Sequence, residues 1–222
     1  CLTCSPVSVQ NKIYSMQDID FSQPFALVKR KSSPEVLAFQ GEMDFYESLS
    51  QIPQPQKITG AEYFETFCAI PFNQIKERGF SVHDDGLKIS ALHIQTQKSY
   101  PLKTVLDFLP QESISLAQGI SYDQSDQEYA QIIKNIIHQE IGNGEGANFV
   151  IERRGRSQIE DMSVEKALTI FRNLLENEIG SHWTFLYFDG YRYLVGASPE
   201  THIALQKKKK KMHPISGTFR KK

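Results

Sequence analysis

Apolar and polar positions alternate in short runs along the first half of the chain, which is typical of strands. Strands are predicted at residues 24–30 and 36–39, joined by a turn at residues 31–34 that contains Pro34. Further strands are predicted at residues 63–70 and 87–96. This half therefore indicates a sheet with short connections and no obvious chemistry of its own.

The second half of the chain carries clearer local signals. A helix is predicted after Ser125, because Glu128 completes a capping box and apolar residues follow at helical spacing as far as Ile137. A second amphipathic helix is predicted after Ser163. Asp189-Gly190 lies between two apolar runs and predicts a tight hairpin turn.

Several weaker patterns complete the expected set of elements. They predict a short helix at residues 41–50, a helical turn at 71–78, a hairpin turn at 83–86, a strand at 147–153, and two strands at 201–205 and 212–219 joined by the lysines at 207–211. Together the elements predict an α+β fold with mostly antiparallel sheets and packed helices.

Composition narrows the class of protein. The chain has 222 residues and a formal net charge of -1, so a nucleic-acid binder with a strongly basic surface is disfavoured. No apolar stretch reaches the roughly 18 residues of a membrane span, and the first residues lack the pattern of a signal peptide. A cytoplasmic protein that binds neither membrane nor nucleic acid is expected.

Cysteine usage agrees with that expectation. The chain has three cysteines, an odd number that does not fit a disulfide framework. Cys1 and Cys4 have the spacing of half a zinc site or of a redox pair, but the histidines are scattered without ligand spacing. An incidental pair is therefore favoured over a metal or redox site.

Two segments have residues that are suited to chemistry. Gly196-Ala-Ser-Pro-Glu200 places a carboxyl group directly after an apolar strand, and Pro214-Ile-Ser-Gly-Thr218 offers backbone N–H groups and a hydroxyl to a ligand. A general acid beside an anionic substrate is one interpretation, and plain turns are the other. Arg153, Arg154 and Arg156 similarly suit either solvation of a strand end or contact with an anion.

The residues from Val195 to His202, followed by Pro214 to Thr218, resemble the paired signature of chorismate-utilising enzymes. That family includes anthranilate synthase component I, aminodeoxychorismate synthase and isochorismate synthase, and residues 129–154 fit its helix-to-strand segment. Ile75-Lys-Glu-Arg-Gly-Phe80 with His83-Asp-Asp-Gly86, and the run from Gly144 to Ile151, are similar to the phenazine-pathway branch, which makes 2-amino-2-desoxyisochorismate.

The resemblance implies a role for five residues. Glu200 would be the general acid that protonates the departing C4 hydroxyl of chorismate, while Gly217 and Thr218 would bind a substrate carboxylate. Asn148 would face the nucleophile at C2, where isochorismate synthases carry a lysine that activates water. Ser216 replaces the nucleophilic lysine of aminodeoxychorismate synthases, so the resemblance favours amination by ammonia over hydration and over the para-aminobenzoate branch.

The resemblance also implies the organisation of the chain. Residues 1–120 would be the N-terminal part of an incomplete sandwich of the anthranilate synthase component I type, and residues 121–222 the beginning of its chorismate-binding domain. Mg²⁺ is expected in the full-length enzyme, with its ligands beyond residue 222, and a glutamine amidotransferase domain or subunit is expected to supply ammonia. A homodimer, a tryptophan feedback site, and the choice of product between anthranilate and 2-amino-2-desoxyisochorismate are left open.

A chain that stops four residues after Thr218 would lack these ligands, and we therefore expect a truncated fragment that is inactive by itself. The alternative is an inactive paralogue that acts as a partner-binding or regulatory module.

Overall fold

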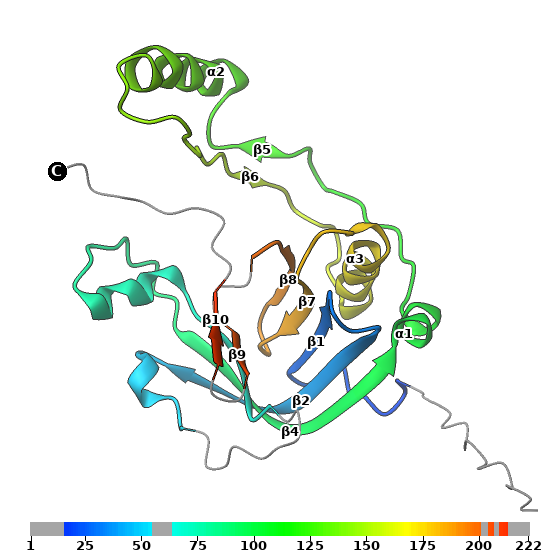
Figure 1. Cartoon of the computed structure of the whole chain (residues 1–222). Helices are drawn as coiled ribbons and strands as arrows, with labels where there is room; N and C mark the ends of the chain where they lie inside the picture. Colours follow the sequence, from blue (N-terminus) through cyan, green and yellow to red (C-terminus); the bar gives the residue numbers. More distant parts are fainter. Residues whose placement is uncertain (1–15, 55–63, 201–203, 207–208, 213–222) are drawn as a thin grey trace, which may run out of the picture. The chain divides into compact units, whose positions relative to one another are not determined.

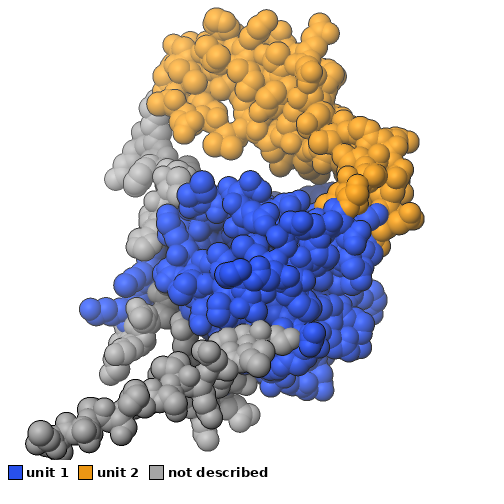
Figure 2. All heavy atoms as spheres, turned by 90° about the vertical axis from the view of Figure 1, so that its right-hand side faces the viewer, with its two compact units in different colours: residues 1–112, 163–222 blue, residues 113–162 orange. Residues whose placement is uncertain are grey.

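The computed structural model describes residues 16–54, 64–200, 204–206 and 209–212 of the chain. It divides into two compact units, and Figure 2 shows them in different colours. Unit 1 comprises residues 1–112 and 163–222, and unit 2 comprises residues 113–162. The boundary expected near residue 120 was drawn by resemblance to a family and stays a prediction.

Unit 1 is built on one antiparallel sheet of six strands (Figure 1). The strands are β1 (Phe25–Arg30), β2 (Glu35–Tyr46), β3 (Thr66–Ala69), β4 (Ile89–Pro101), β7 (Trp183–Phe188) and β8 (Tyr193–Ser198). Their order across the sheet is β3-β4-β2-β1-β7-β8, and every neighbouring pair is antiparallel. Together with the helices, this sheet confirms the predicted α+β class.

Two α-helices, α1 (Leu102–Phe108) and α3 (Val164–Asn177), contribute to the core on one face of the sheet. Phe25 and Leu27 of β1 share that core with Val105 of α1 and Phe171 of α3, and all four side chains are buried. Arg172 of α3 ties the helices together, because its guanidinium donates to the carbonyl oxygens of Leu106 and, at 2.8 Å, of Leu109. α1 follows directly on β4 and has no side-chain N-cap, which is why its sequence offered no helix start.

The opposite face of the same sheet is also apolar. It can be buried because the sheet curls (Figure 1). Ala26 and Val28 alternate with the residues of the first core and belong to a second buried cluster. Phe67 of β3 and Tyr187 of β7 belong to strands that three others separate in the sheet order, yet their ring centroids are 5.1 Å apart. The curled sheet thereby buries its second face against itself, and burial raises the pKa of Tyr187 to about 12.

The short helix predicted at residues 41–50 is wrong. Residues 41–46 instead continue β2, which pairs with β4 along its whole length from Glu35 to Tyr46, and only Leu49–Gln51 form a single 3₁₀ turn, η1. Long-range pairing with a central strand overrides the local helical pattern here. The helical turn predicted at residues 71–78 is confirmed as η2 (Phe72–Arg78), which ends at Gly79 with φ 80°.

Unit 2 consists of one helical rod and a short strand pair. The rod is α2 (Asp126–Asn135) continued by η3 (Ile136–Ile141), a π-helical segment. β5 (Ser121–Tyr122) pairs with β6 (Gly155–Arg156). The predicted capping box is confirmed, since Ser125 Oγ accepts from the Glu128 backbone at 3.2 Å and Glu128 Oε2 accepts from the Ser125 backbone at 2.8 Å.

The strand predicted at residues 147–153 is also wrong, because that segment has no ladder. Side chains hold it instead: the Tyr129 hydroxyl donates to the Ile151 carbonyl at 3.2 Å, and the Arg153 guanidinium lies 4.1 Å from the centre of the Tyr122 ring. Arg153 also donates to the Gln124 carbonyl at 2.8 Å. Arg153 therefore serves the internal structure of unit 2.

At the end of the described chain, β9 (Ala204–Gln206) and β10 (Lys209–Lys211) form an antiparallel pair. The lysine run was predicted to be only the loop between two strands, but Lys209–Lys211 pair with β9 and remain exposed. The strand predicted at residues 212–219 lies, apart from Met212, outside the described residues.

Candidate functional site

Glu200 lies just beyond β8, the strand at one end of the sheet order. The Glu200 backbone N–H donates to Ser198 Oγ at 3.4 Å, and the same hydroxyl donates to the Glu200 carbonyl at 3.2 Å. The Ser-Pro-Glu motif is therefore a local turn organised by its own serine. Glu200 is exposed, so the described residues do not shield this carboxyl group from water.

The β7–β8 hairpin fixes where that turn lies. Asp189, 2% exposed, accepts from the backbone N–H groups of Tyr191 and Arg192 at 3.0 and 2.9 Å, and from Arg192 Nε at 2.8 Å. Gly190 adopts φ 90°, which suits glycine. The predicted Asp189-Gly190 turn is confirmed, and the register then continues to the Trp183–Ser198 pair two residues before Glu200.

Gly196 of the same motif has a packing reason to be glycine. A Cβ atom there would lie 3.0 Å from the ring of Phe185, its partner across the β7–β8 ladder. Such a distance is tighter than ordinary contact, so a larger residue would push the ring aside. The motif therefore joins a close strand contact to the turn that carries Glu200.

The structure gives less information on the positions of the other predicted site residues. Asn148 is exposed, lies in unit 2, and belongs to the segment without a ladder. Its place relative to Glu200 stays a prediction, because the two residues belong to different units. Ser216, Gly217 and Thr218 lie outside the described residues.

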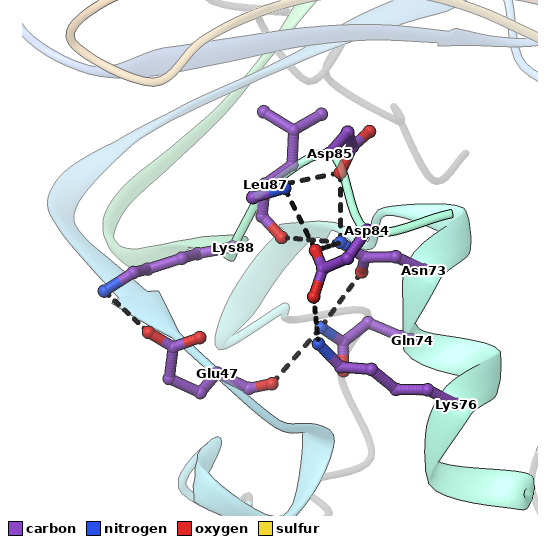
Figure 3. A network of polar contacts seen from close by, with 9 residues as sticks. Glu47, Asn73, Gln74, Lys76, Asp84, Asp85, Leu87 and Lys88 are labelled. Atoms are coloured by element: carbon purple, nitrogen blue, oxygen red, sulfur yellow. Dashed lines mark hydrogen bonds and ion pairs between the residues drawn. The ribbon is translucent and has the colours of Figure 1, made fainter. Parts of the chain in front are cut away.

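A buried polar network lies beside η2, as Figure 3 shows, and the sequence did not indicate it. Asn73, 3% exposed, donates through Nδ2 to Asp84 Oδ1 at 3.2 Å, Asp85 Oδ1 at 3.0 Å and the Leu87 carbonyl at 3.1 Å. Gln74 is also buried and donates to the Glu47 carbonyl at 3.2 Å. The network therefore fastens the 84–87 loop to η2.

Ion pairs and turn hydrogen bonds complete this network. Lys76 Nζ lies 3.2 Å from Asp84 Oδ2, and the Gly86 backbone N–H donates to Asp84 Oδ1 at 3.0 Å. The Gly86 N–H and then the Lys76 ammonium hold the pKa of Asp84 below its usual value. This stretch carries two of the three segments that resemble the phenazine branch, and those two have a structural explanation that requires no ligand.

We expect Asn73→Ala to lower the free energy of unfolding by about 2 kcal/mol, because it deprives two carboxylates and a carbonyl of a buried donor. Urea denaturation monitored by circular dichroism measures the change. Asn177→Ala is the matched control, because exposed Asn177 bonds only locally, to the Asn173 carbonyl at 2.8 Å, and should shift stability by less than about 0.5 kcal/mol. Equal changes in the free energy of unfolding for the two substitutions would show that the buried network does not stabilise the fold.

The described residues hold no group of three or more His, Cys, Asp or Glu side chains that could bind a metal ion. Mg²⁺ binding by the complete enzyme stays a prediction. Burial raises the pKa of the Cys68 thiol, so that cysteine is not activated as a nucleophile. Cys1 and Cys4 lie outside the described residues.

Within the described chain, no helix combines the length and the apolar character needed to cross a bilayer.

Comparison with known proteins gives matches over most of the chain. Residues 30–222 match the family described as chorismate binding enzyme. A protein of Pseudomonas chlororaphis and one of Pseudomonas fluorescens, each named "Anthranilate synthase, phenazine specific", are 42% and 41% identical to this chain over 201 residues. The match covers 89% of this chain and 31% of each relative, so the chain spans about a third of the length of these curated relatives.

Proposed function

The chain belongs to the chorismate-binding enzyme family, and from this premise we propose that it is part of an enzyme that aminates chorismate at C2. The observation that carries the proposal is the similarity, over 89% of the chain, to two proteins named phenazine-specific anthranilate synthases. The same similarity favours an enzymatic role over a module that only binds a partner. Glutamine is the proposed source of the ammonia, delivered by an amidotransferase domain or subunit.

In the proposed reaction, ammonia forms a bond to C2 of chorismate, the ring double bonds shift, and the C4 hydroxyl leaves as water. Glu200 would give the leaving oxygen its proton, as the family's Ser-Pro-Glu glutamate does. A general acid must hold its proton until the transition state, and shielding from water favours the neutral carboxyl group. Because Glu200 is exposed in the described chain, this role requires bound substrate or further polypeptide over the turn.

Asn148 is the residue that we propose for the side of the nucleophile. An amide cannot remove a proton from water, but it can accept and donate hydrogen bonds to an ammonia molecule. Ammonia that arrives unprotonated needs no base, so an asparagine at this position suits amination. Mg²⁺ stays an expectation for the complete enzyme, and no step is derived through it.

The direct test uses a hybrid enzyme, in which residues 1–222 replace the matched segment of the Pseudomonas chlororaphis relative. Purified hybrid enzyme is supplied with chorismate, ammonium and Mg²⁺, and the products are separated by liquid chromatography and identified by mass. An aminated product that requires ammonium is expected. A hybrid that binds chorismate and yields only isochorismate would exclude the proposed function.

Asn148→Lys should shift the hybrid enzyme towards isochorismate. A lysine beside C2, with its pKa lowered by burial under the substrate, can act as a base for water. We expect the ratio of isochorismate to aminated product to rise at least about tenfold, measured in the same chromatographic assay. Asn143→Lys is the matched control, because Asn143 is an exposed asparagine five residues earlier, and it should leave the ratio unchanged. An unchanged ratio in Asn148→Lys would mean that Asn148 does not face the nucleophile.

A further inference from the structure

Three polar side chains of the sheet in unit 1 converge on one point. They are Asp44 and Tyr46 of β2 and His93 of β4. Nε2 of His93 lies 3.0 Å from the Tyr46 hydroxyl oxygen and 3.3 Å from Asp44 Oδ2, and that hydroxyl oxygen lies 3.4 Å from the same Asp44 atom. The three atoms therefore form a nearly equilateral triangle, which the function proposed above does not use.

The β2–β4 ladder places these three side chains on one face of the sheet. Asp44 pairs with Ala91, and Tyr46 pairs with Ile89. Ala91 and Ile89 precede His93 in β4 by even numbers of residues, and both paired and alternate residues share a face, so all three side chains point the same way. The rings of Tyr46 and His93 pack edge to face with centroids 6.1 Å apart, which orients the imidazole. Two paired strands, and no loop, therefore hold the triangle.

Hydrogen bonds alone cannot occupy all three sides of this triangle. The Tyr46 hydroxyl has one hydrogen, Nε2 of His93 has at most one, and the ionised Asp44 carboxylate has none to donate. At most two hydrogens are thus available for three short separations, so at least one side joins two atoms with no hydrogen between them. A cation bound over the triangle would contact all three atoms at once.

The spacing and the kind of ligand atoms favour Zn²⁺ over Mg²⁺. In a tetrahedral site with bonds of about 2.0–2.1 Å, two ligand atoms lie about 3.3–3.4 Å apart. Two sides of the triangle have that length, 3.3 and 3.4 Å. Neighbouring ligand atoms of an octahedral Mg²⁺ site lie closer, about 2.9 Å apart. The imidazole of His93 also suits Zn²⁺, whereas Mg²⁺ prefers oxygen ligands.

The charge around the triangle and its access to solvent also suit a cation. Exposed Glu42 lies opposite His93 in the ladder, so the carboxylates of Glu42 and Asp44 both flank the imidazole from β2. β2 and β3 contain no Lys or Arg, and the one such residue of β4, Lys98, pairs with Asp18. The side chain of His93 is 27% exposed and that of Asp44 61%, so an ion can reach both from solvent.

Cys68 of β3 does not belong to this set of ligands. It pairs with Ala91, which therefore lies between Cys68 and Asp44 in the sheet. Two strand spacings, about 9–10 Å, separate the backbones of Cys68 and Asp44, and burial raises the pKa of the Cys68 thiol. Partial burial and then the Asp44 carboxylate raise the pKa of Tyr46, so its hydroxyl would be a neutral and weaker ligand. The fourth position is left to water.

We propose that Asp44, Tyr46 and His93 form a Zn²⁺ site on the β2–β4 ladder of unit 1, with water as the fourth ligand. Tyrosine is essential to the set, because the described residues offer no group of three His, Cys, Asp or Glu side chains for a metal. Bound Zn²⁺ bridges β2 and β4 and stabilises the folded chain, since the unfolded chain does not hold the three ligands together. The proposal uses no residue of the proposed reaction and does not depend on it.

Calorimetric titration with Zn²⁺ tests the site without any measurement of activity. The 222-residue chain and the hybrid enzyme are each freed of metal and titrated, and both should show saturable binding. His93→Gln and, separately, Asp44→Asn should weaken this binding at least about tenfold. Tyr46→Phe keeps the ring and removes only the hydroxyl, so it should weaken binding less. Circular dichroism of the metal-free variants should match that of the parent, which separates a lost ligand from a lost fold.

Two matched controls distinguish ligands from their surroundings. His138→Gln removes an exposed histidine of unit 2 and should leave the affinity for Zn²⁺ unchanged. Glu42→Gln removes a charge beside the site whose carboxylate already accepts from Gln95 Nε2 at 2.9 Å, and it should weaken binding much less than Asp44→Asn. Mg²⁺ in about a thousandfold excess should not displace Zn²⁺ from the parent, because the site has an imidazole ligand.

Co²⁺ in place of Zn²⁺ reports the geometry, because four-coordinate Co²⁺ absorbs visible light far more strongly than six-coordinate Co²⁺. We expect the strong spectrum, with no band from a bound thiolate, and its loss in His93→Gln. Equal affinities for Zn²⁺ in the parent and in His93→Gln would overturn the proposal, as would the absence of saturable binding up to about 100 µM Zn²⁺. A weak six-coordinate spectrum, or a thiolate band that disappears in Cys68→Ser, would show that the ligand set is wrong.

Discussion

Glu200→Gln in the hybrid enzyme is expected to lower turnover of chorismate by about 10²- to 10⁴-fold, the usual contribution of a positioned general acid. The substitution keeps the size of the side chain and its place after the Ser198 turn, and it removes only the proton that the leaving C4 oxygen requires. Chorismate should still bind, because glutamine can occupy the same space. The loss should therefore lie in kcat, with KM nearly unchanged.

Steady-state kinetics with ammonium as the nitrogen source measure this effect separately from any glutaminase. Glu112→Gln is the matched control, because Glu112 is an exposed glutamate of unit 1 with no assigned role, and it should leave kcat within about twofold. If kcat of Glu200→Gln stays within threefold of the parent, Glu200 is not the general acid, even if the hybrid aminates chorismate.

Signals contained within a few residues predicted their structures correctly. The capping box of Ser125 and Glu128 begins α2, and the hydroxyl of Ser163 accepts from the Lys166 backbone at 3.3 Å at the start of α3. Asp189-Gly190 closes the β7–β8 hairpin. Each of these is decided by hydrogen bonds among neighbouring residues, so the sequence alone is sufficient.

Two elements whose structure depends on distant partners were predicted wrongly. Residues 41–46 carry a local pattern that fits a helix, but the β2–β4 ladder recruits them into a strand of 12 residues. Residues 147–153 look like an apolar strand, yet the hydroxyl of Tyr129 and the stack of Arg153 on Tyr122 hold them in an irregular path. No window of sequence around these residues contains the partner that decides the outcome.

The candidate site shows the same limit in its chemistry. The residue pattern alone indicated the Ser-Pro-Glu turn as a candidate site, but it fitted a plain turn equally well. The role of Glu200 came from the resemblance to a family. The network of Asn73 was not predicted, because an asparagine in a helical turn gives no sign in the sequence that it will be 3% exposed. The nearby His83-Asp-Asp-Gly86 motif was a signal for it, and it was interpreted only as a turn and as a mark of the family branch.

Gly41→Ala is expected to have the largest effect on stability of any single-methyl change in unit 1. Gly41 lies at the irregularity of the β2–β4 ladder, where the register shifts between Gln40 and Gly41. A Cβ atom at Gly41 would lie 1.8 Å from the carbonyl oxygen of His93 and 2.9 Å from the backbone nitrogen of Gln95. Both are backbone atoms of β4, so no side chain can rotate away and the two strands themselves must separate.

Because β4 and β2 lie inside the sheet order, their separation disturbs both apolar clusters that the curled sheet encloses. Overpacking of a core costs about 1–3 kcal/mol when side chains can adjust, so a clash with backbone should cost about 3 kcal/mol or more. That is a large part of the 5–15 kcal/mol that holds a typical domain together. The variant should unfold at a much lower urea concentration than the parent, or fail to fold at 37 °C.

Fluorescence of Trp183 measures this unfolding, because it is the chain's single tryptophan and lies in β7 of the affected sheet. Gly180→Ala is the matched control within unit 1: its Cβ would meet only the Glu178 carboxylate, at 3.6 Å, and its stability should change by less than about 0.5 kcal/mol. A Gly41→Ala midpoint as close to the parent's as that of Gly180→Ala would show that β2 and β4 do not approach as closely at the bulge as the structure has them. In that event the pairing of residues 35–46 with β4, on which the curl of the sheet depends, would be wrong.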